Sequence, residues 1–112
     1  MAELNIAIAD DNRQTLEMLG EILESEKDYH VVGKADNGNE AYNMIMRTKP
    51  DVVLLDIVMP GMDGISVMEK VKSNEEFKEN TSFIMVTAAS SENLTADAFK
   101  LGASYYIMKP FT

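Results

Sequence analysis

An apolar run that ends in a carboxylate constrains this chain more than any other segment. Residues 52–55 are all Val or Leu, Asp56 follows them directly, and residues 60–64 form a segment rich in Pro and Gly. Short β-branched runs with such boundaries are typical of strands buried on both faces of a parallel sheet. A carboxylate at the end of such a strand lies at the sheet edge where open α/β folds keep their sites. Asp56 is therefore the first candidate functional residue, although an Asp there can also serve only to accept loop amides.

Strand and helix patterns alternate along the whole chain. Residues 4–9, 30–35, 83–87 and 104–108 are further predicted strands, each a short apolar run. Apolar residues at three- and four-residue steps predict helices over residues 12–25, between residue 37 and Pro50, around residues 65–71, and over residues 91–101 with Gly102 as the stop. This alternation predicts a doubly wound α/β domain, with a parallel sheet covered by helices on both faces.

Two helix starts carry capping signals. Asp11 with Gln14 three residues later resembles a capping box, so an Asp at this position can act as a helix cap. Asn37 with Glu40 fits the start of the second helix. Asn37-Gly38 is also a hairpin signal, but the helical spacing of the apolar residues that follow argues against a hairpin.

Four of the five predicted strands end in polar residues able to do chemistry. The first ends at Asp10 and Asp11, the third at Asp56, the fourth at Thr87 and the fifth at Lys109. The second strand ends at Asp36, which we expect to lie at the periphery. Since the carboxyl ends of parallel strands share one edge, the first three carboxylates should converge there.

Converging carboxylates repel one another unless a cation joins them. An all-oxygen ligand set suits Mg²⁺ or Mn²⁺ rather than zinc. Lys109 would add a positive charge and Thr87 a hydroxyl, a combination suited to a phosphoryl group that Asp56 attacks as nucleophile to give an acyl phosphate. Each residue alone has a simpler interpretation: Lys109 precedes a proline in what is usually a loop, Thr87 suits a turn, and Asp10 and Asp11 suit a cap and a solvated acid.

Composition limits the function classes. The chain has 112 residues, enough for one domain, and 46% of them are hydrophobic, which favours a folded globule over disorder. It has no cysteine, no leader and no long apolar run, so disulfides, thiolate metal sites and membrane insertion are not expected, and the cytoplasm is favoured. Its net charge of −9 argues against nucleic-acid contact by this domain.

The strand-end residues belong to longer segments that resemble the receiver domains of two-component response regulators. The matching segments are Asp10-Asp11, residues 56–64, Thr87-Ala88 and residues 102–111, so the likeness extends from the first strand to the end of the chain. It implies a flavodoxin-like, doubly wound five-stranded parallel sheet in strand order 2-1-3-4-5. Only four helices are predicted here, so we expect residues 1–112 to be one receiver domain truncated before its fifth helix.

The resemblance also implies roles for the acidic residues. Asp56 would be the phosphoacceptor. Asp10, Asp11, Asp56 and the backbone carbonyl of Val58 would hold Mg²⁺, with Mn²⁺ or Ca²⁺ as substitutes.

The remaining implied roles fall on the last two strands. Thr87 and Lys109 would grip the phosphoryl oxygens. Tyr106 would be a rotating switch aromatic, and the peptide bond before Pro110 would be cis, an isomer that proline makes accessible.

The family implies partners as well. A sensor histidine kinase or a histidine phosphotransferase would donate the phosphoryl group, and a DNA-binding domain beyond residue 112 would receive the signal, with a homodimer as one way to do so. The domain would not be an enzyme beyond its own phosphorylation and slow dephosphorylation. Residues 9–13, 36–38 and 102–112 resemble more narrowly the receivers of sporulation regulators from spore-forming Firmicutes.

Four alternatives differ in testable features. A haloacid-dehalogenase-like phosphatase needs a second Asp two residues after its nucleophile, where this chain has Val58. A P-loop enzyme needs a glycine-rich loop ending in Lys and Ser or Thr, which is absent. A flavodoxin-like cofactor binder would leave the three acids unexplained. The strongest alternative is a degenerate receiver that acts as a phosphorylation-independent docking module.

Overall fold

A computed structural model describes residues 3–77, 81–88 and 105–109. They form a five-stranded sheet in the order β2-β1-β3-β4-β5, in which every neighbouring pair is parallel. The elements are β1 (Leu4–Ala9), α1 (Arg13–Glu24), β2 (Tyr29–Ala35), α2 (Gly38–Thr48), β3 (Val52–Asp56), α3 (Gly64–Ser73), β4 (Ser82–Ala88) and β5 (Tyr105–Lys109). The predicted parallel α/β architecture is confirmed. The predicted helix over residues 91–101 lies outside the described residues, and the fifth helix stays a prediction.

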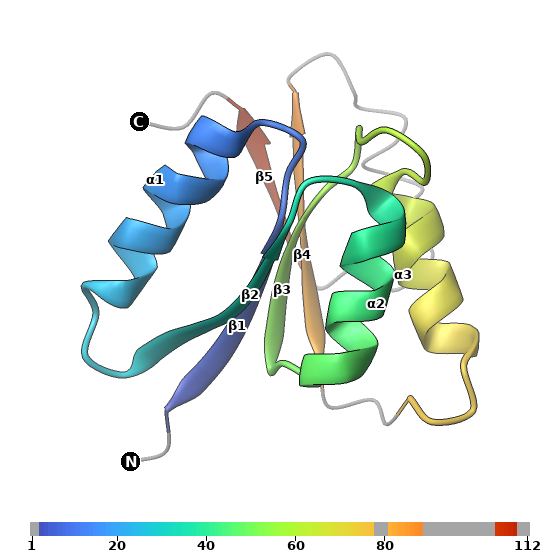
Figure 1. Cartoon of the computed structure of the whole chain (residues 1–112), viewed down its shortest axis with the longest axis horizontal. Coiled ribbons are helices and arrows are strands. Elements are labelled where there is room, and N and C mark those ends of the chain that lie inside the picture. Colours follow the sequence, from blue (N-terminus) through green and yellow to red (C-terminus); the bar gives the residue numbers. More distant parts are fainter. Residues whose placement is uncertain (1–2, 78–80, 89–104, 110–112) are drawn as a thin grey trace.

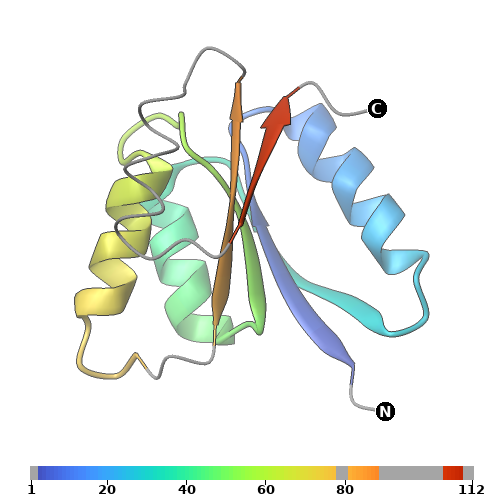
Figure 2. The ribbon, with the colours of Figure 1, turned by 180° about the vertical axis from the view of Figure 1, so that it is seen from behind.

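The helices lie on opposite faces of the sheet. Figure 1 shows α1 on one face, with α2 and α3 side by side on the other. Figure 2, seen from behind, shows β4 and β5 at the edge of the sheet opposite to β2. None of the helices in the described part of the chain is long and apolar enough to cross a bilayer.

Side chains of β3 alternate between the two faces, as the two-residue period of a strand requires. Val53 and Leu55 belong to the large core beneath α2 and α3, whereas Val52 and Leu54 pack against the smaller core beneath α1. The larger core also contains Phe83, which is fully buried. Val53 and Leu55 are buried and Val52 and Leu54 are partly buried, so the apolar run of residues 52–55 is a central strand covered on both faces.

The first two helices differ in how well their starts were predicted. The Asn12 side chain caps α1 by accepting a hydrogen bond from the Thr15 amide at 3.2 Å. The predicted Asp11 cap is therefore wrong by one residue. At α2 the prediction is confirmed, because the Asn37 side chain accepts from the Glu40 amide at 2.9 Å.

Candidate functional site

The β1–β3 pairing brings two carboxylates to one point. Ala9 pairs with Leu55 across the two strands, and each is followed directly by an aspartate. Asp10 is 1% exposed and Asp56 is 4% exposed. Asp11 is exposed, and the three side chains each place an oxygen so that all lie within 4.8 Å of one another. The predicted convergence of these three acids is confirmed.

Backbone amides orient the two buried carboxylates. The Asn12 amide donates to Asp10 Oδ1 at 2.9 Å, and the Val58 amide donates to Asp56 Oδ1 at 3.2 Å. Both contacts span two residues, the arrangement by which an aspartate stabilises its own loop. The simpler interpretation of these residues, that they accept loop amides, is thus also true. It does not explain why three like charges gather, since such a cluster costs free energy without a cation.

The loop after β3 is held closely to Asp56. The Gly64 amide donates to the Ile57 carbonyl at 2.7 Å, closing the loop between Asp56 and α3. A Cβ atom on Gly64 would lie within 2.9 Å of the Asp56 carbonyl carbon and 3.0 Å of Ile57 Cα. Only glycine permits this approach, so Gly64 fixes the path of the chain as it leaves Asp56.

The backbone of the last two strands places further predicted residues at the same edge. Thr87 pairs with Met108, and Ala88 pairs with Lys109, at the carboxyl ends of β4 and β5. Tyr106 pairs with Met85 nearer the middle of the sheet. Pro110 and the peptide bond before it lie outside the described residues.

The three carboxylates fit a divalent cation. They supply hard oxygen ligands, which suit Mg²⁺, Mn²⁺ or Ca²⁺, and Asp11 is exposed whereas Asp10 and Asp56 are buried. Val58 lies in the loop beside them, and its amide makes the hydrogen bond to Asp56. The described residues therefore contain a candidate metal centre next to a buried carboxylate.

Comparison with protein families identifies this arrangement. Residues 6–112 match the model of the response regulator receiver domain. The chain belongs to this family.

Solved receiver structures share the fold of this receiver domain. It is 33% identical to a chain in the CheX–CheY–BeF₃–Mg²⁺ complex from Borrelia burgdorferi, with a TM-score of 0.86 over 99% of this chain and 81% of that one. It is 31% identical to the receiver domain of the putative response regulator NarL from Mycobacterium tuberculosis, with a TM-score of 0.89 over 100% and 88%. A LuxR-family DNA-binding response regulator from Staphylococcus aureus is 26% identical, with a TM-score of 0.87 over 97% and 88%.

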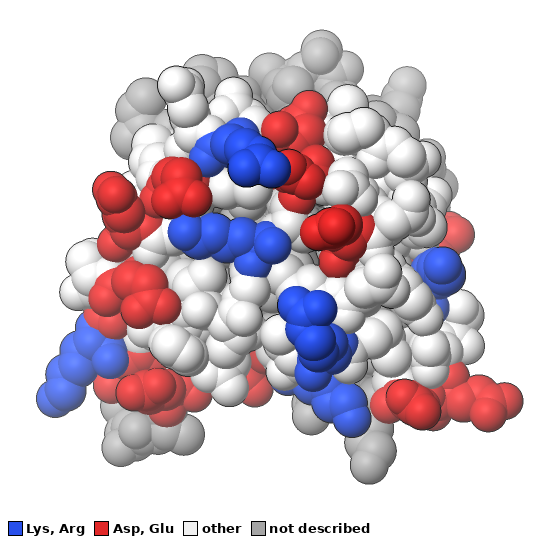
Figure 3. Space-filling model, viewed as in Figure 1, with Lys and Arg blue, Asp and Glu red and all other residues white. Residues whose placement is uncertain are grey.

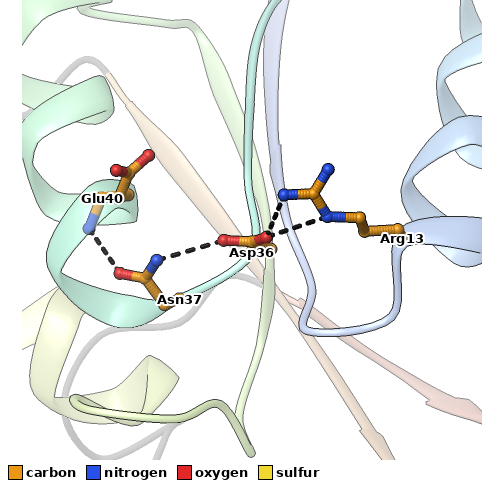
Figure 4. A network of polar contacts seen from close by, with 4 residues as sticks. All are labelled: Arg13, Asp36, Asn37 and Glu40. Atoms are coloured by element: carbon orange, nitrogen blue, oxygen red, sulfur yellow. Dashed lines mark hydrogen bonds and ion pairs between the residues drawn. The ribbon is translucent and has the colours of Figure 1, made fainter.

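A polar network beside the receiver's acidic cluster was not predicted. Arg13 donates through Nε to Asp36 Oδ2 at 3.2 Å and forms an ion pair with it at 3.0 Å. Asn37 donates to Asp36 Oδ1 at 3.1 Å, and it accepts from the Glu40 amide (Figure 4). The network joins the first residue of α1 to the start of α2. An acid directly after a strand, beside a helix cap, is the only sequence signal that pointed to it.

Charges of both signs are interspersed on the face that contains this network. Figure 3 shows basic and acidic side chains lying next to one another in the upper part of this face. Arg13 pairs with Asp36 at 3.0 Å, and Lys34 pairs with Glu17 at 3.6 Å. Asp36 follows β2, the edge strand of the sheet, which agrees with the expected peripheral position, and it is not one of the three clustered acids.

Proposed function

We propose that Asp56 accepts a phosphoryl group in a reaction that needs a divalent cation bound by Asp10 and Asp11. The observation that carries this proposal is the position of the three carboxylates, whose oxygens lie within 4.8 Å at the carboxyl edge of the sheet. Accepting loop amides explains each carboxylate singly, whereas a cation site next to a nucleophile explains why the three lie together and serves phosphoryl transfer.

The chemistry follows from the residue types. A carboxylate oxygen of Asp56 forms a bond to phosphorus, and the bond from phosphorus to the donor atom breaks, with its electron pair leaving on that donor. Mg²⁺, when bound, neutralises charge on the phosphoryl oxygens. We assign the Val58 carbonyl to the metal, and Lys109 and Thr87 to the phosphoryl oxygens. Pairing of β4 and β5 supports the last two roles, because it brings both residues to this edge.

The family suggests donor and output. A histidine kinase or histidine phosphotransferase would supply the phosphoryl group, and the domain would act as a switch in the cytoplasm rather than as an enzyme on other substrates. Similarity to a DNA-binding response regulator of the LuxR family supports transcription control as the output, through a DNA-binding domain in the parent protein.

The narrower resemblance extends this proposal to sporulation. Residues 9–13, 36–38 and 102–112 resemble the receiver of stage-zero sporulation protein A, which implies that the transcriptional output starts spore formation. The structural neighbours described above support the receiver family and not this subgroup. Deletion of the parent gene in a spore-forming host tests the extension, since normal sporulation of the deletion strain would exclude it.

Intact mass spectrometry tests phosphorylation directly. The domain is incubated with acetyl phosphate and Mg²⁺, and its mass should rise by one phosphoryl group, whereas Asp56→Asn should show no rise. Asp63→Asn is the matched control, because Asp63 lies in the same loop and caps α3 through the Ser66 amide, a role that Asn also performs well. A parent domain that is never labelled would instead favour the phosphorylation-independent docking module.

A further inference from the structure

We propose that Gly38, the first residue of α2, is a positioning residue for the loop that follows Asp56. The helix start and the loop lie in direct contact, although they belong to different βα units of the chain. This inference rests on the metal-dependent phosphorylation proposed above, and it assigns to Gly38 the positioning of the loop beside the metal site.

The contact between Gly38 and the loop is made by backbone atoms. Gly38 is buried, and its amide donates to the Pro60 carbonyl at 3.3 Å. A Cβ atom on Gly38 would lie 2.6 Å from the Met62 carbonyl carbon and closer still to the Met62 carbonyl oxygen. A flexible side chain could move aside, but here the backbone of the loop itself would have to shift. Any residue larger than glycine therefore displaces the loop.

The tip of the same loop rests against the next residue of the helix. Gly61 has a φ of +81°, a left-handed conformation that favours glycine, and the position of its Cβ would be 3.4 Å from Asn39 Nδ2. At its other end the loop is closed on Asp56 by Gly64. The loop is thus held at its base, by Gly64 against Asp56, and near its tip, by Gly38 against Met62.

The polar network of Figure 4 extends this support to the other acidic residues. Asp36 binds Arg13, the first residue of α1, and Asn37, the cap of α2. Arg13 follows Asn12, whose amide binds Asp10. The β1–α1 loop carries Asp10 and Asp11, and through Arg13 it contacts the start of α2. Gly38, in the same helix start, contacts the loop that follows Asp56. Partners of this kind, which orient ligands without touching the metal, typically contribute roughly 10- to 100-fold to metal affinity.

The matched pair Gly38→Ala and Gly20→Ala tests the steric contact. Gly20 is also buried, but a Cβ there would meet only the end of the Lys34 side chain, at 2.7 Å, which can move. Both variants are titrated with Mg²⁺ by amide NMR. Gly38→Ala should weaken Mg²⁺ binding about tenfold or more and shift the amides of residues 57–62, whereas Gly20→Ala should stay within about twofold of the parent.

A second pair keeps the proposal testable if Gly38→Ala does not fold. Asp36→Ala removes the shared partner of Arg13 and Asn37, while Glu40→Ala removes the same charge nearby and keeps the amide that Asn37 binds. Figure 4 shows the Glu40 carboxylate directed away from Asn37. Asp36→Ala should weaken Mg²⁺ binding and slow labelling by acetyl phosphate severalfold more than Glu40→Ala does, at an equal melting temperature without metal.

The outcomes separate this inference from the proposed function. If the parent neither binds Mg²⁺ nor is labelled, the proposed function fails, and the amide shifts of residues 57–62 alone decide whether Gly38 positions the loop. If the parent is active and Gly38→Ala shows parental Mg²⁺ affinity, labelling rate and loop amide shifts, the positioning role is overturned. Equal effects of Asp36→Ala and Glu40→Ala would overturn it as well.

Discussion

Asp10 directly follows β1 and Asp56 ends the neighbouring parallel strand β3, and both carboxylates are buried with oxygens within 4.8 Å of each other and of Asp11. Two buried acids at this distance lower the stability of the fold unless a cation or a proton compensates their charge. A bound cation would offset this repulsion, so metal binding should raise the free energy of unfolding of the domain.

Mg²⁺ should stabilise the folded domain. A ligand that binds only the native state adds about 2.7 kcal/mol to the free energy of unfolding at roughly 100 times its dissociation constant. Asp11→Asn should melt at a higher temperature than the parent without metal, since it removes one repelling charge, and should gain less from Mg²⁺. Thermal melts with and without Mg²⁺ measure both effects. Glu21→Gln, an exposed change on α1, is the control, and an unchanged parental melt in saturating Mg²⁺ would refute the site.

Self-dephosphorylation should be slow. Val58 lies two residues past Asp56 and is 56% exposed. We expect its side chain to flank the path of water to the acyl phosphate, and a valine can neither orient water nor act as a base. Ala89, two residues past Thr87 in the sequence, is equally inert. Val58→Asn should shorten the lifetime of the phosphorylated form about tenfold, whereas Val58→Leu should leave it unchanged. Loss of the phosphoryl mass is followed over time, and a parental lifetime of seconds would show that another group directs the water.

Thr87 and Tyr106 should act as one switch. They lie on the paired strands β4 and β5, where Tyr106 stands two residues before Met108, the pairing partner of Thr87. Once Asp56 is phosphorylated, the Thr87 hydroxyl should bind a phosphoryl oxygen and leave space into which Tyr106 rotates, shifting the balance between two states. Thr87→Ala should be labelled but lose the NMR response at Tyr106, and Thr87→Ser should retain it. A parental response in Thr87→Ala would disprove the coupling.

The core beneath α2 and α3 should dominate the stability of the domain. Phe83 is fully buried there, and Phe83→Ala should lower the free energy of unfolding by about 3–5 kcal/mol, because it leaves a cavity. Ile22 on α1 is 54% exposed, and Ile22→Ala should change it by less than about 0.5 kcal/mol. Urea denaturation compares the two, and similar losses would mean that α1 covers more of the sheet in solution than it does here.

Sequence patterns were sufficient to predict the acidic cluster, because its position follows from where the strands end and from the common edge of a parallel sheet. Residues 52–55 predicted a buried strand, residues 4–9 another, and the common edge of parallel strands brought Asp10 and Asp56 together. The cap of α1 was misplaced by one residue because Asp and Asn are almost equally good caps, so the local preference does not separate Asp11 from Asn12.

The support around the site could not be predicted in the same way. The contact between Gly38 and Met62 joins two βα units and has no periodic signal in the sequence. From the sequence, Asn37-Gly38 therefore indicated only a turn or a helix start. The ion pair between Arg13 and Asp36 likewise depends on how α1 and β2 are placed in space. Contacts of this kind follow from tertiary packing, which a local pattern does not encode.

Chemical mapping of the phosphorylated residue is the most direct test of phosphoryl transfer to Asp56. The domain is treated with acetyl phosphate and Mg²⁺, reduced with borohydride, which converts an aspartyl phosphate to homoserine, and digested for peptide mass spectrometry. We expect homoserine at position 56 and at no other aspartate, and no conversion when Mg²⁺ is removed with a chelator. Homoserine at another aspartate with Asp56 unchanged, or full labelling of Asp56→Asn, would contradict this role of Asp56.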